Sequence, residues 1–161
     1  MPVQIRRASS NDTEALIRVA LSAWAPVFAS FRQVLGPKVY GLVYPDWQAQ
    51  QRDVVTKVCA QREDVAVWVA DIDGTVAGFI AYSLDGTNET GTVELLAVDP
   101  DYQNGGIGTD LNLFALARMK ESGMKVASLS TGGDPGHAPA RRAYEKAGYT
   151  AFPIVWYYKD L

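Results

Sequence analysis

The sequence has little of several residue types that mark whole classes of protein. Its 161 residues include one cysteine, Cys59, and one histidine, His137. An intramolecular disulfide is therefore excluded, and these two side chains alone cannot build a zinc site, so no metal is expected. The N-terminus lacks an apolar signal core, and no apolar run approaches the length of a membrane span. We therefore expect a cytoplasmic protein in a reducing compartment, without a membrane partner.

The chain also lacks a strong surplus of charge. It has 15 Lys and Arg against 18 Asp and Glu, which gives a net charge of −3. Nucleic-acid binding needs a basic face, so no nucleic acid is expected as a partner. The small acidic surplus favours a cationic substrate only weakly. There is no internal repeat, linker or low-complexity tract, so residues 1–161 are expected to form a single domain.

Glycine, by contrast, is concentrated at one place. Residues 93–98 are apolar and rich in β-branched side chains, as in a buried strand, and Asp99-Pro100 ends them. Gly105, Gly106 and Gly108 follow, and a helix is predicted from about Ile107. Backbone N–H groups in such a loop, at the positive end of a helix dipole, form an anion site for a phosphate or pyrophosphate. The alternative is a tight strand-to-helix connection without a ligand.

Periodicity predicts the remaining elements. Asn11 and Glu14 fit a capping box at the start of a helix, whose apolar pattern is interrupted at Pro26 and stops at Gly36-Pro37. Asp46 can cap a second helix, and Tyr40 and Tyr44 are expected in the segment between the two. Further helices are predicted from about residue 107 to Gly123 and over 137–146, and strands over 3–7, 65–70, 76–83, 125–130 and 151–159.

This order of elements predicts an α/β fold. The strands around the Asp73-Gly74 turn favour antiparallel pairing. The strand, helix and strand over residues 93–130 favour a parallel pair, because such a crossover returns the chain in the same direction. We therefore expect a mixed, mostly antiparallel sheet with helices on both faces.

Two segments resemble the GCN5-related N-acetyltransferase (GNAT) family. Residues 103–108, Gln-Asn-Gly-Gly-Ile-Gly, fit its (Arg/Gln)-x-x-Gly-x-(Gly/Ala) loop. Residues 140–149, Ala-Arg-Arg-Ala-Tyr-Glu-Lys-Ala-Gly-Tyr, are similar to its second motif, a helix that carries Tyr-Glu-Lys-x-Gly-Phe. The two motifs occur in the family's order and near its usual separation, and the order of strands agrees. A dinucleotide-binding fingerprint fits worse, because Leu111 stands where its third glycine is needed.

The resemblance implies transfer of an acetyl group from acetyl-CoA to a primary amine of a small molecule or peptide. In the family, the strand before the glycine loop diverges from the strand after the helix. The pantetheine arm pairs with the exposed backbone there, and the loop holds the pyrophosphate. The cofactor-binding residues implied for this chain are Leu96, Ala97, Val98, Gln103, Asn104, Gly105, Gly106, Ile107, Gly108, Thr109, His137 and Tyr144.

The chemistry needs a group that protonates the departing thiolate and a group that takes the amine proton. Tyr144 stands at the position of the family's catalytic tyrosine, so the resemblance implies that it is the thiolate donor. Glu94, a carboxylate inside an apolar strand, is the candidate base. Strand alternation would put it on the same face as Leu96 and Val98, where partial burial would raise its pKa. The family often has its glutamate two positions earlier, where Thr92 stands here.

His137 stands where the family usually has asparagine, and it could cap the helix, contact CoA or act as the base. Gly105 replaces a frequent arginine of the family, which removes a cationic contact to the phosphates; Arg141 and Arg142 could compensate. Cys59 is far in sequence from both motifs, so direct transfer is expected rather than a covalent acyl-cysteine.

The acceptor amine is expected to meet the aromatic N-terminal helical segment. Trp24, Phe28, Phe31 and Glu94 are the candidate substrate-binding residues, although a core position is also consistent with the aromatic ones. The alternative function is an acyl-CoA-binding sensor or regulatory domain without turnover. Many members of the family dimerise, so the resemblance also allows a homodimer.

Overall fold

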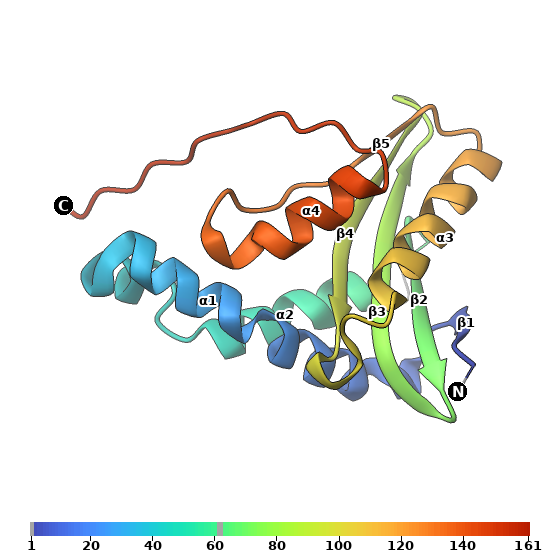
Figure 1. Ribbon diagram of the computed structural model, residues 1–161, viewed down its shortest axis with the longest axis horizontal. Coiled ribbons are helices and arrows are strands. Elements are labelled where there is room, and N and C mark those ends of the chain that lie inside the picture. Colours follow the sequence, from blue (N-terminus) through green and yellow to red (C-terminus); the bar gives the residue numbers. More distant parts are fainter. Residues whose placement is uncertain (1, 61–62) are drawn as a thin grey trace.

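The computed structural model describes residues 2–60 and 63–161. The strands in these residues form one mixed sheet of five strands (Figure 1). The strands lie in the order β1-β2-β3-β4-β5, with antiparallel pairing from β1 to β4 and a parallel pair between β4 and β5. This confirms the predicted α/β architecture. The strands are β1 (Gln4–Arg7), β2 (Val65–Ile72), β3 (Thr75–Asp85), β4 (Thr90–Val98) and β5 (Val126–Ser128).

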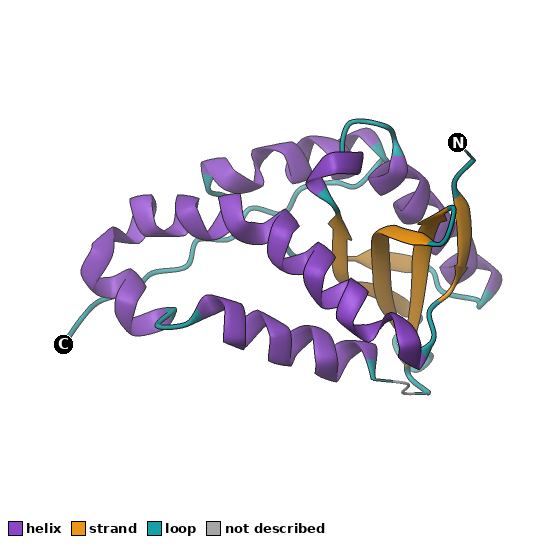
Figure 2. Ribbon diagram, turned by 90° about the horizontal axis from the view of Figure 1, so that it is seen from below, coloured by secondary structure: helices purple, strands orange, loops and turns teal. Residues whose placement is uncertain are grey.

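Helices cover both faces of the sheet (Figure 2). The N-terminal helices pack on one face, where Leu16, Ile17 and Val55 join side chains such as Phe79 in a core. The helix after the glycine loop packs on the other face through Leu111 and Met119. The helices are α1 (Thr13–Val43), α2 (Trp47–Cys59), α3 (Ile107–Glu121) and α4 (Ala138–Lys146), with short 3-10 turns η1 (Ser10–Asp12), η2 (Pro100–Tyr102) and η3 (Pro135–His137).

The first helix differs from its prediction at both ends. Its entry is organised by Ser9 and Asp12 rather than by Asn11 and Glu14, because the Ser9 backbone N–H donates to Asp12 Oδ2 at 2.7 Å. The helix also continues past Pro26. At Gly36, φ is +77°, so the chain kinks there and a further helical segment runs to Val43. A proline after this kink can begin a new turn, since the first turn of a helix needs no N–H donor.

Residues 10–43 are together long and apolar enough for a membrane span by length and composition, contrary to the prediction from sequence. The core helix of a soluble protein passes the same test. Here one face of α1 contributes Leu16, Ile17, Val19 and Ala20 to the core against the sheet.

A β-bulge interrupts β4 at Glu94. Tyr82 pairs with Val93 while the neighbouring Ala81 pairs with Leu95, so Glu94 is the extra residue. A bulge changes the face to which side chains on one side of it point. Val93 therefore packs with the α3 core, together with Leu96.

The predicted last strand is absent from the sheet. Residues 151–161, the C-terminal tail, are extended but pair with no strand in the described part of the chain. In both overall views the tail runs away from the sheet and ends beside the far end of α1 (Figures 1 and 2). The prediction of a strand over residues 151–159 was therefore wrong.

Candidate active site

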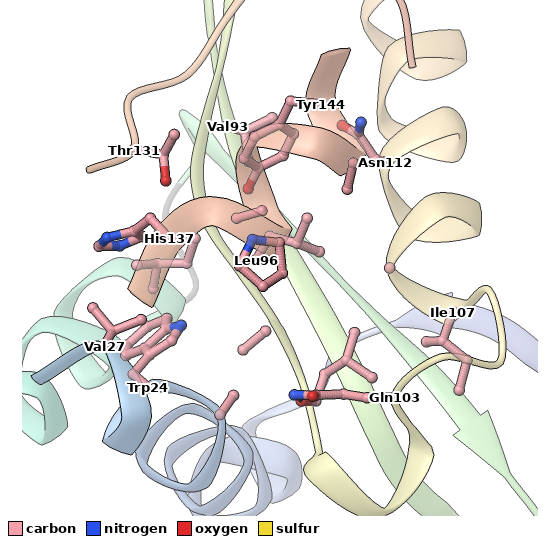
Figure 3. A pocket seen from close by; sticks show the side chains of 18 of the residues that line it. Trp24, Val27, Val93, Leu96, Gln103, Ile107, Asn112, Thr131, His137 and Tyr144 are labelled. Carbon is pink, nitrogen blue, oxygen red and sulfur yellow. Dashed lines mark hydrogen bonds between the residues drawn. The ribbon is translucent and has the colours of Figure 1, made fainter. Parts of the chain in front are cut away.

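A cleft opens where β4 and β5 separate. The two strands pair only from Thr90 with Val126 to Thr92 with Ser128. Beyond this point, β4 and the segment after β5 form the walls of a cleft of about 550 Å³. Side chains from α1, the glycine loop and α4 complete the lining (Figure 3). Unpaired strand edges in such a cleft offer hydrogen-bonding backbone to an extended, amide-containing ligand.

The N-terminus of α3 closes one end of the cleft. Gly106 is its N-cap with φ of +89° and has no side chain to cap the helix, and Asn104 before it also has a positive φ, +65°. The first N–H groups of a helix have no partner within the helix, so those of Ile107, Gly108 and Thr109 are available to an anion. Gln103 fixes the loop, because its Nε2 donates to the Val98 carbonyl at 2.9 Å.

The cleft contains most of the predicted cofactor-binding residues. They are Leu96, Ala97, Val98, Gln103, Asn104, Gly106, Ile107, Gly108, Thr109, His137 and Tyr144. Gly105 is exposed and is not part of the lining. Arg141 is engaged elsewhere, because Nη1 donates to the carbonyls of Gly132 at 2.6 Å and Asp134 at 2.7 Å. Its guanidinium therefore holds the loop before α4 instead of replacing the arginine missing from the glycine loop.

Tyr144 projects from α4 into the cleft beside Val93 (Figure 3). Burial, with a smaller contribution from Tyr149, raises the pKa of Tyr144 to about 12. Its hydroxyl is therefore protonated at neutral pH, as a proton donor must be. No hydrogen bond of this hydroxyl to another described residue is found. Tyr149 instead packs edge-on against the Tyr144 ring, with centroids 5.9 Å apart.

His137 is held by a polar cluster under α4. Its Nδ1 lies 2.5 Å from Asp134 Oδ1, and the Ser30 hydroxyl donates to Asp134 Oδ2 at 2.7 Å. Burial raises the pKa of Asp134, but the hydrogen bonds from Ser30 and His137 outweigh it, so the pKa lies below its ordinary value. The carboxylate is therefore ionised and fixes the imidazole, which leaves Nε2 as the ring nitrogen free for other partners.

Two glycines make room for this cluster. A Cβ at Gly132 would collide with Asp134 and His137, and one at Gly136 would lie 2.6 Å from Cβ of Ser30. The sequence carried a signal for the cluster that the prediction did not use. Asp134 precedes a proline and stands three positions before His137, the spacing at which side chains meet on a 3-10 turn. Ser30 had no such signal, because it lies 104 positions from Asp134 along the chain.

Glu94 lines the cleft but does not have the surroundings that were predicted. Its side chain is exposed, and the Ser83 hydroxyl donates to its Oε1 at 2.5 Å. Because of the bulge, Glu94 points to the α1 side with Ser83, whereas Leu96 packs on the α3 side. The prediction that Glu94 shares a face with Leu96 and is partly buried was therefore wrong.

The aromatic residues of α1 divide into two groups. Trp24 lines the cleft (Figure 3). Phe28 is buried and stacks on Trp47 with ring centroids 4.4 Å apart, and neither Phe28 nor Phe31 belongs to the cleft lining. Phe31 lies behind His137, with ring centroids 5.5 Å apart. The structure thus brings one of these three predicted substrate-binding aromatics to the cleft.

Comparison with known proteins agrees with this arrangement. The sequence model of the family described as "Acetyltransferase (GNAT) family" matches residues 31–149. The chain is 29% identical over 137 residues to an uncharacterized N-acetyltransferase of Archaeoglobus fulgidus, a match that covers 81% of this chain and 82% of that protein. It is 31% identical over 118 residues to a mycothiol acetyltransferase of Saccharomonospora viridis, which covers 65% of this chain but only 38% of that longer protein.

A solved structure has the same fold. The PaiA N-acetyltransferase of Thermoplasma acidophilum, in complex with coenzyme A, superposes with a TM-score of 0.71 at 22% identity, over 96% of this chain and 94% of that chain.

Proposed function

The chain belongs to the GNAT acetyltransferase family, and we propose that it transfers an acetyl group from acetyl-CoA directly to a primary amine of a small molecule or peptide. The observation that carries this proposal is the convergence of three features on one cleft. These are the unpaired backbone of β4, the uncapped N-terminus of α3 and the protonated hydroxyl of Tyr144. They match, in order, an amide-rich arm, a pyrophosphate and a departing thiolate.

The residues present fit coenzyme A as the acetyl carrier. N–H groups at Ile107, Gly108 and Thr109 would bind the pyrophosphate at the positive end of the helix dipole. Backbone groups of Leu96 to Val98 would pair with the pantetheine amides. Bound there, the thioester supplies an activated acetyl carbonyl to the part of the cleft near Tyr144.

Proton transfer completes the reaction. The amine nitrogen forms a bond to the acetyl carbon, the carbon–sulfur bond breaks, and the Tyr144 hydroxyl donates its proton to the thiolate. We propose His137 Nε2 as the acceptor of the amine proton, directly or through one water, because Asp134 fixes the ring through Nδ1 and His137 lines the cleft. Glu94, exposed and facing the α1 side, is assigned to attraction of a cationic amine together with Trp24.

Direct transfer also agrees with the state of Cys59. Burial raises the pKa of this thiol to about 11, so the nucleophilic thiolate is scarce at neutral pH. Cys59 ends α2 and is not part of the cleft lining. An acyl-cysteine intermediate is therefore not part of the proposal.

The test is release of free CoA from acetyl-CoA by the purified protein, across a panel of aminoglycosides, polyamines, amino acids and peptides with free N-termini. The Tyr144→Phe variant should reduce kcat about 100-fold, the size of a lost proton donor, with acetyl-CoA affinity nearly unchanged. Tight binding of acetyl-CoA without release of CoA on any amine would contradict turnover and favour an acyl-CoA-binding sensor.

A further inference from the structure

The cleft has two ends with different linings (Figure 3). Gln103 and Ile107 lie at one end, which contains the backbone N–H groups proposed to bind the pyrophosphate of coenzyme A. Side chains of α1 line the other end, below His137 in this view. This second end, here called the acceptor end, is what remains for the amine. Its lining residues from α1 are Ala23, Trp24, Pro26 and Val27.

His137 is seated against the same face of α1. Its ring lies behind the cleft lining on Phe31, with centroids 5.5 Å apart. Val27 precedes Phe31 by four residues, about 6 Å of helical rise, and Trp24 lies three residues further back, so the three share one face of the helix. An amine whose nitrogen lies at His137 Nε2 therefore carries its substituent along Val27 and Trp24.

The acceptor end is poor in charged side chains. Among the described residues that line the cleft, Glu94 is the one carboxylate, and none is a lysine or an arginine. Residues 15–45, which include nearly all of α1, contain no aspartate or glutamate. A second ammonium group in the acceptor would therefore meet apolar side chains, and burying a charge without a partner is costly. A carboxylate in the acceptor would likewise meet no cationic side chain of the lining.

Glu94 supplies one charge to match one ammonium group. The bulge in β4 turns its side chain to the α1 side of the sheet, and the Ser83 hydroxyl donates to its Oε1 at 2.5 Å. This hydrogen bond fixes the carboxylate on the side from which the acceptor end is lined. One cation on the acceptor is thus attracted, and a further cation has no second carboxylate in the lining.

The α1 side chains of the acceptor end suit an apolar group. Trp24 and Val27 are half-buried and line the cleft, so part of their surface is available to a ligand. Covering this surface removes apolar area from water on both partners, which favours binding. An aromatic ring in the acceptor gains more, because it can pack edge-on or offset against the Trp24 indole.

We propose that the acceptor is a small amine with one positive charge and an apolar, preferably aromatic, substituent, and that polyamines, aminoglycosides and free amino acids are poor acceptors. The inference rests on the proposed acetyl transfer and narrows its acceptor. Glu94 attracts the single ammonium group, and Val27 and Trp24 cover the substituent. Val27 and Trp24 are therefore specificity-determining residues.

Matched amines test the charge requirement on the unmodified protein. Pentylamine and pentane-1,5-diamine have the same carbon chain and differ by one ammonium group. With saturating acetyl-CoA at neutral pH, kcat/KM from the release of free CoA should be at least tenfold higher for pentylamine. 2-Phenylethylamine should be a better acceptor than pentylamine. Free phenylalanine, which adds a carboxylate to 2-phenylethylamine, should be at least tenfold poorer than 2-phenylethylamine.

Variants of α1 test the placement of the acceptor. Val27→Asp puts a carboxylate at the acceptor end, so kcat/KM for the diamine should rise at least tenfold relative to pentylamine. Val27→Asn is the matched control, because it is equally polar but uncharged and should not reverse the preference. Val34→Asp adds a charge to the same helix at an exposed position outside the cleft lining, and the wild-type preference should persist. Trp24→Ala should lower kcat/KM for 2-phenylethylamine about tenfold, with KM for acetyl-CoA within about threefold.

Failure of this inference and failure of the proposed function give different results. Faster turnover of the diamine, of an aminoglycoside or of phenylalanine than of the two monocationic amines would overturn the inference and leave acetyl transfer intact. Release of CoA with no amine at all would overturn the proposed function, and the inference with it. An equal shift of preference in Val27→Asp and Val34→Asp would contradict the placement of the substituent along Val27.

Discussion

At the level of single residues, the base is the assignment that the structure changes most. The sequence favoured Glu94, since a carboxylate in an apolar strand was expected to be half-buried. The bulge turns Glu94 to the α1 side, where it meets Ser83, and the one histidine of the chain is instead fixed by Asp134. A bulge leaves no mark in a pattern of alternating residues, so sequence reasoning could not place this side chain.

The roles of these two residues can be separated by steady-state kinetics. If His137 accepts the amine proton, His137→Gln should lower kcat about 100-fold, because the amine then lacks its proton acceptor. Glu94→Gln should mainly raise KM for a cationic amine, with kcat little changed. A large loss of kcat in Glu94→Gln, with full kcat in His137→Gln, would reverse the two assignments.

Asp134 is a positioning residue rather than a catalytic one, because it contacts His137 and Ser30 and not the reacting groups in this proposal. Asp134→Asn should keep the loop in place, since an amide can still accept from Ser30, but an amide holds the imidazole less firmly than a carboxylate does. We expect kcat to fall about tenfold, with the KM for acetyl-CoA and the thermal midpoint little changed. A fall in the thermal midpoint that accompanies the loss of kcat would indicate a purely structural role.

At the level of elements, the strand–loop–helix around Gly106 was predictable because its signals are local. Asp99-Pro100 ends the strand, the positive φ of Gly106 suits glycine, and α3 begins at the predicted Ile107. The kink of α1 was predictable only in part. Gly36 marks a break, but the apolar pattern stops there and does not show that the helix resumes and continues to Val43.

The anion site at α3 can be tested through one backbone donor. Gly108→Pro removes an N–H in the first turn, where proline is tolerated, and Gly108→Ala keeps that N–H. A Cβ at this position would lie 3.5 Å from Val98 Cγ2, an ordinary contact that both variants share. The proline variant should bind CoA about tenfold more weakly than the alanine variant, by calorimetry. Equal affinities in the two variants, with equal helix content by circular dichroism, would show that this N–H does not bind the cofactor.

A carboxylate joins the first strand to the start of α1. Arg6 donates to Asp12 at 2.9 Å and to Asp71 at 2.9 Å, and the hydrogen bond from Arg6 lowers the pKa of Asp12 to about 2. A lowered pKa adds stability that is fully present above the ordinary value near 4 and is lost as the pH falls through about 2. The unfolding free energy should therefore drop by about 2 kcal/mol over this interval.

Denaturant unfolding between pH 2 and 5 measures this loss. Asp12→Asn should remove most of this pH dependence and lower the unfolding free energy at pH 5. Glu14→Gln is the control, because the pair of Glu14 with Arg52 is exposed and contributes little. If the unfolding free energy of Asp12→Asn still falls between pH 5 and 2 as it does in the wild-type chain, another carboxylate causes the acid sensitivity.

At the level of the whole molecule, the element order identified the sheet, but the destination of the last segment could not be read from it. The pattern of residues 151–159 is that of a strand, and strand propensity does not specify which sheet the strand joins. In the structure the path of the chain after α4 leads away from β5, so the segment joins no strand of the described sheet.

The C-terminal tail and cofactor binding should be separable in this protein. No residue of the tail is among those that line the cleft. The double variant Ile154→Lys with Trp156→Lys changes two exposed positions of the tail, so its KM for acetyl-CoA should stay within about threefold of the wild-type value. Steady-state kinetics of the two chains side by side measure this ratio. A large loss of acetyl-CoA affinity in this variant would mean that the tail shapes the cleft after all.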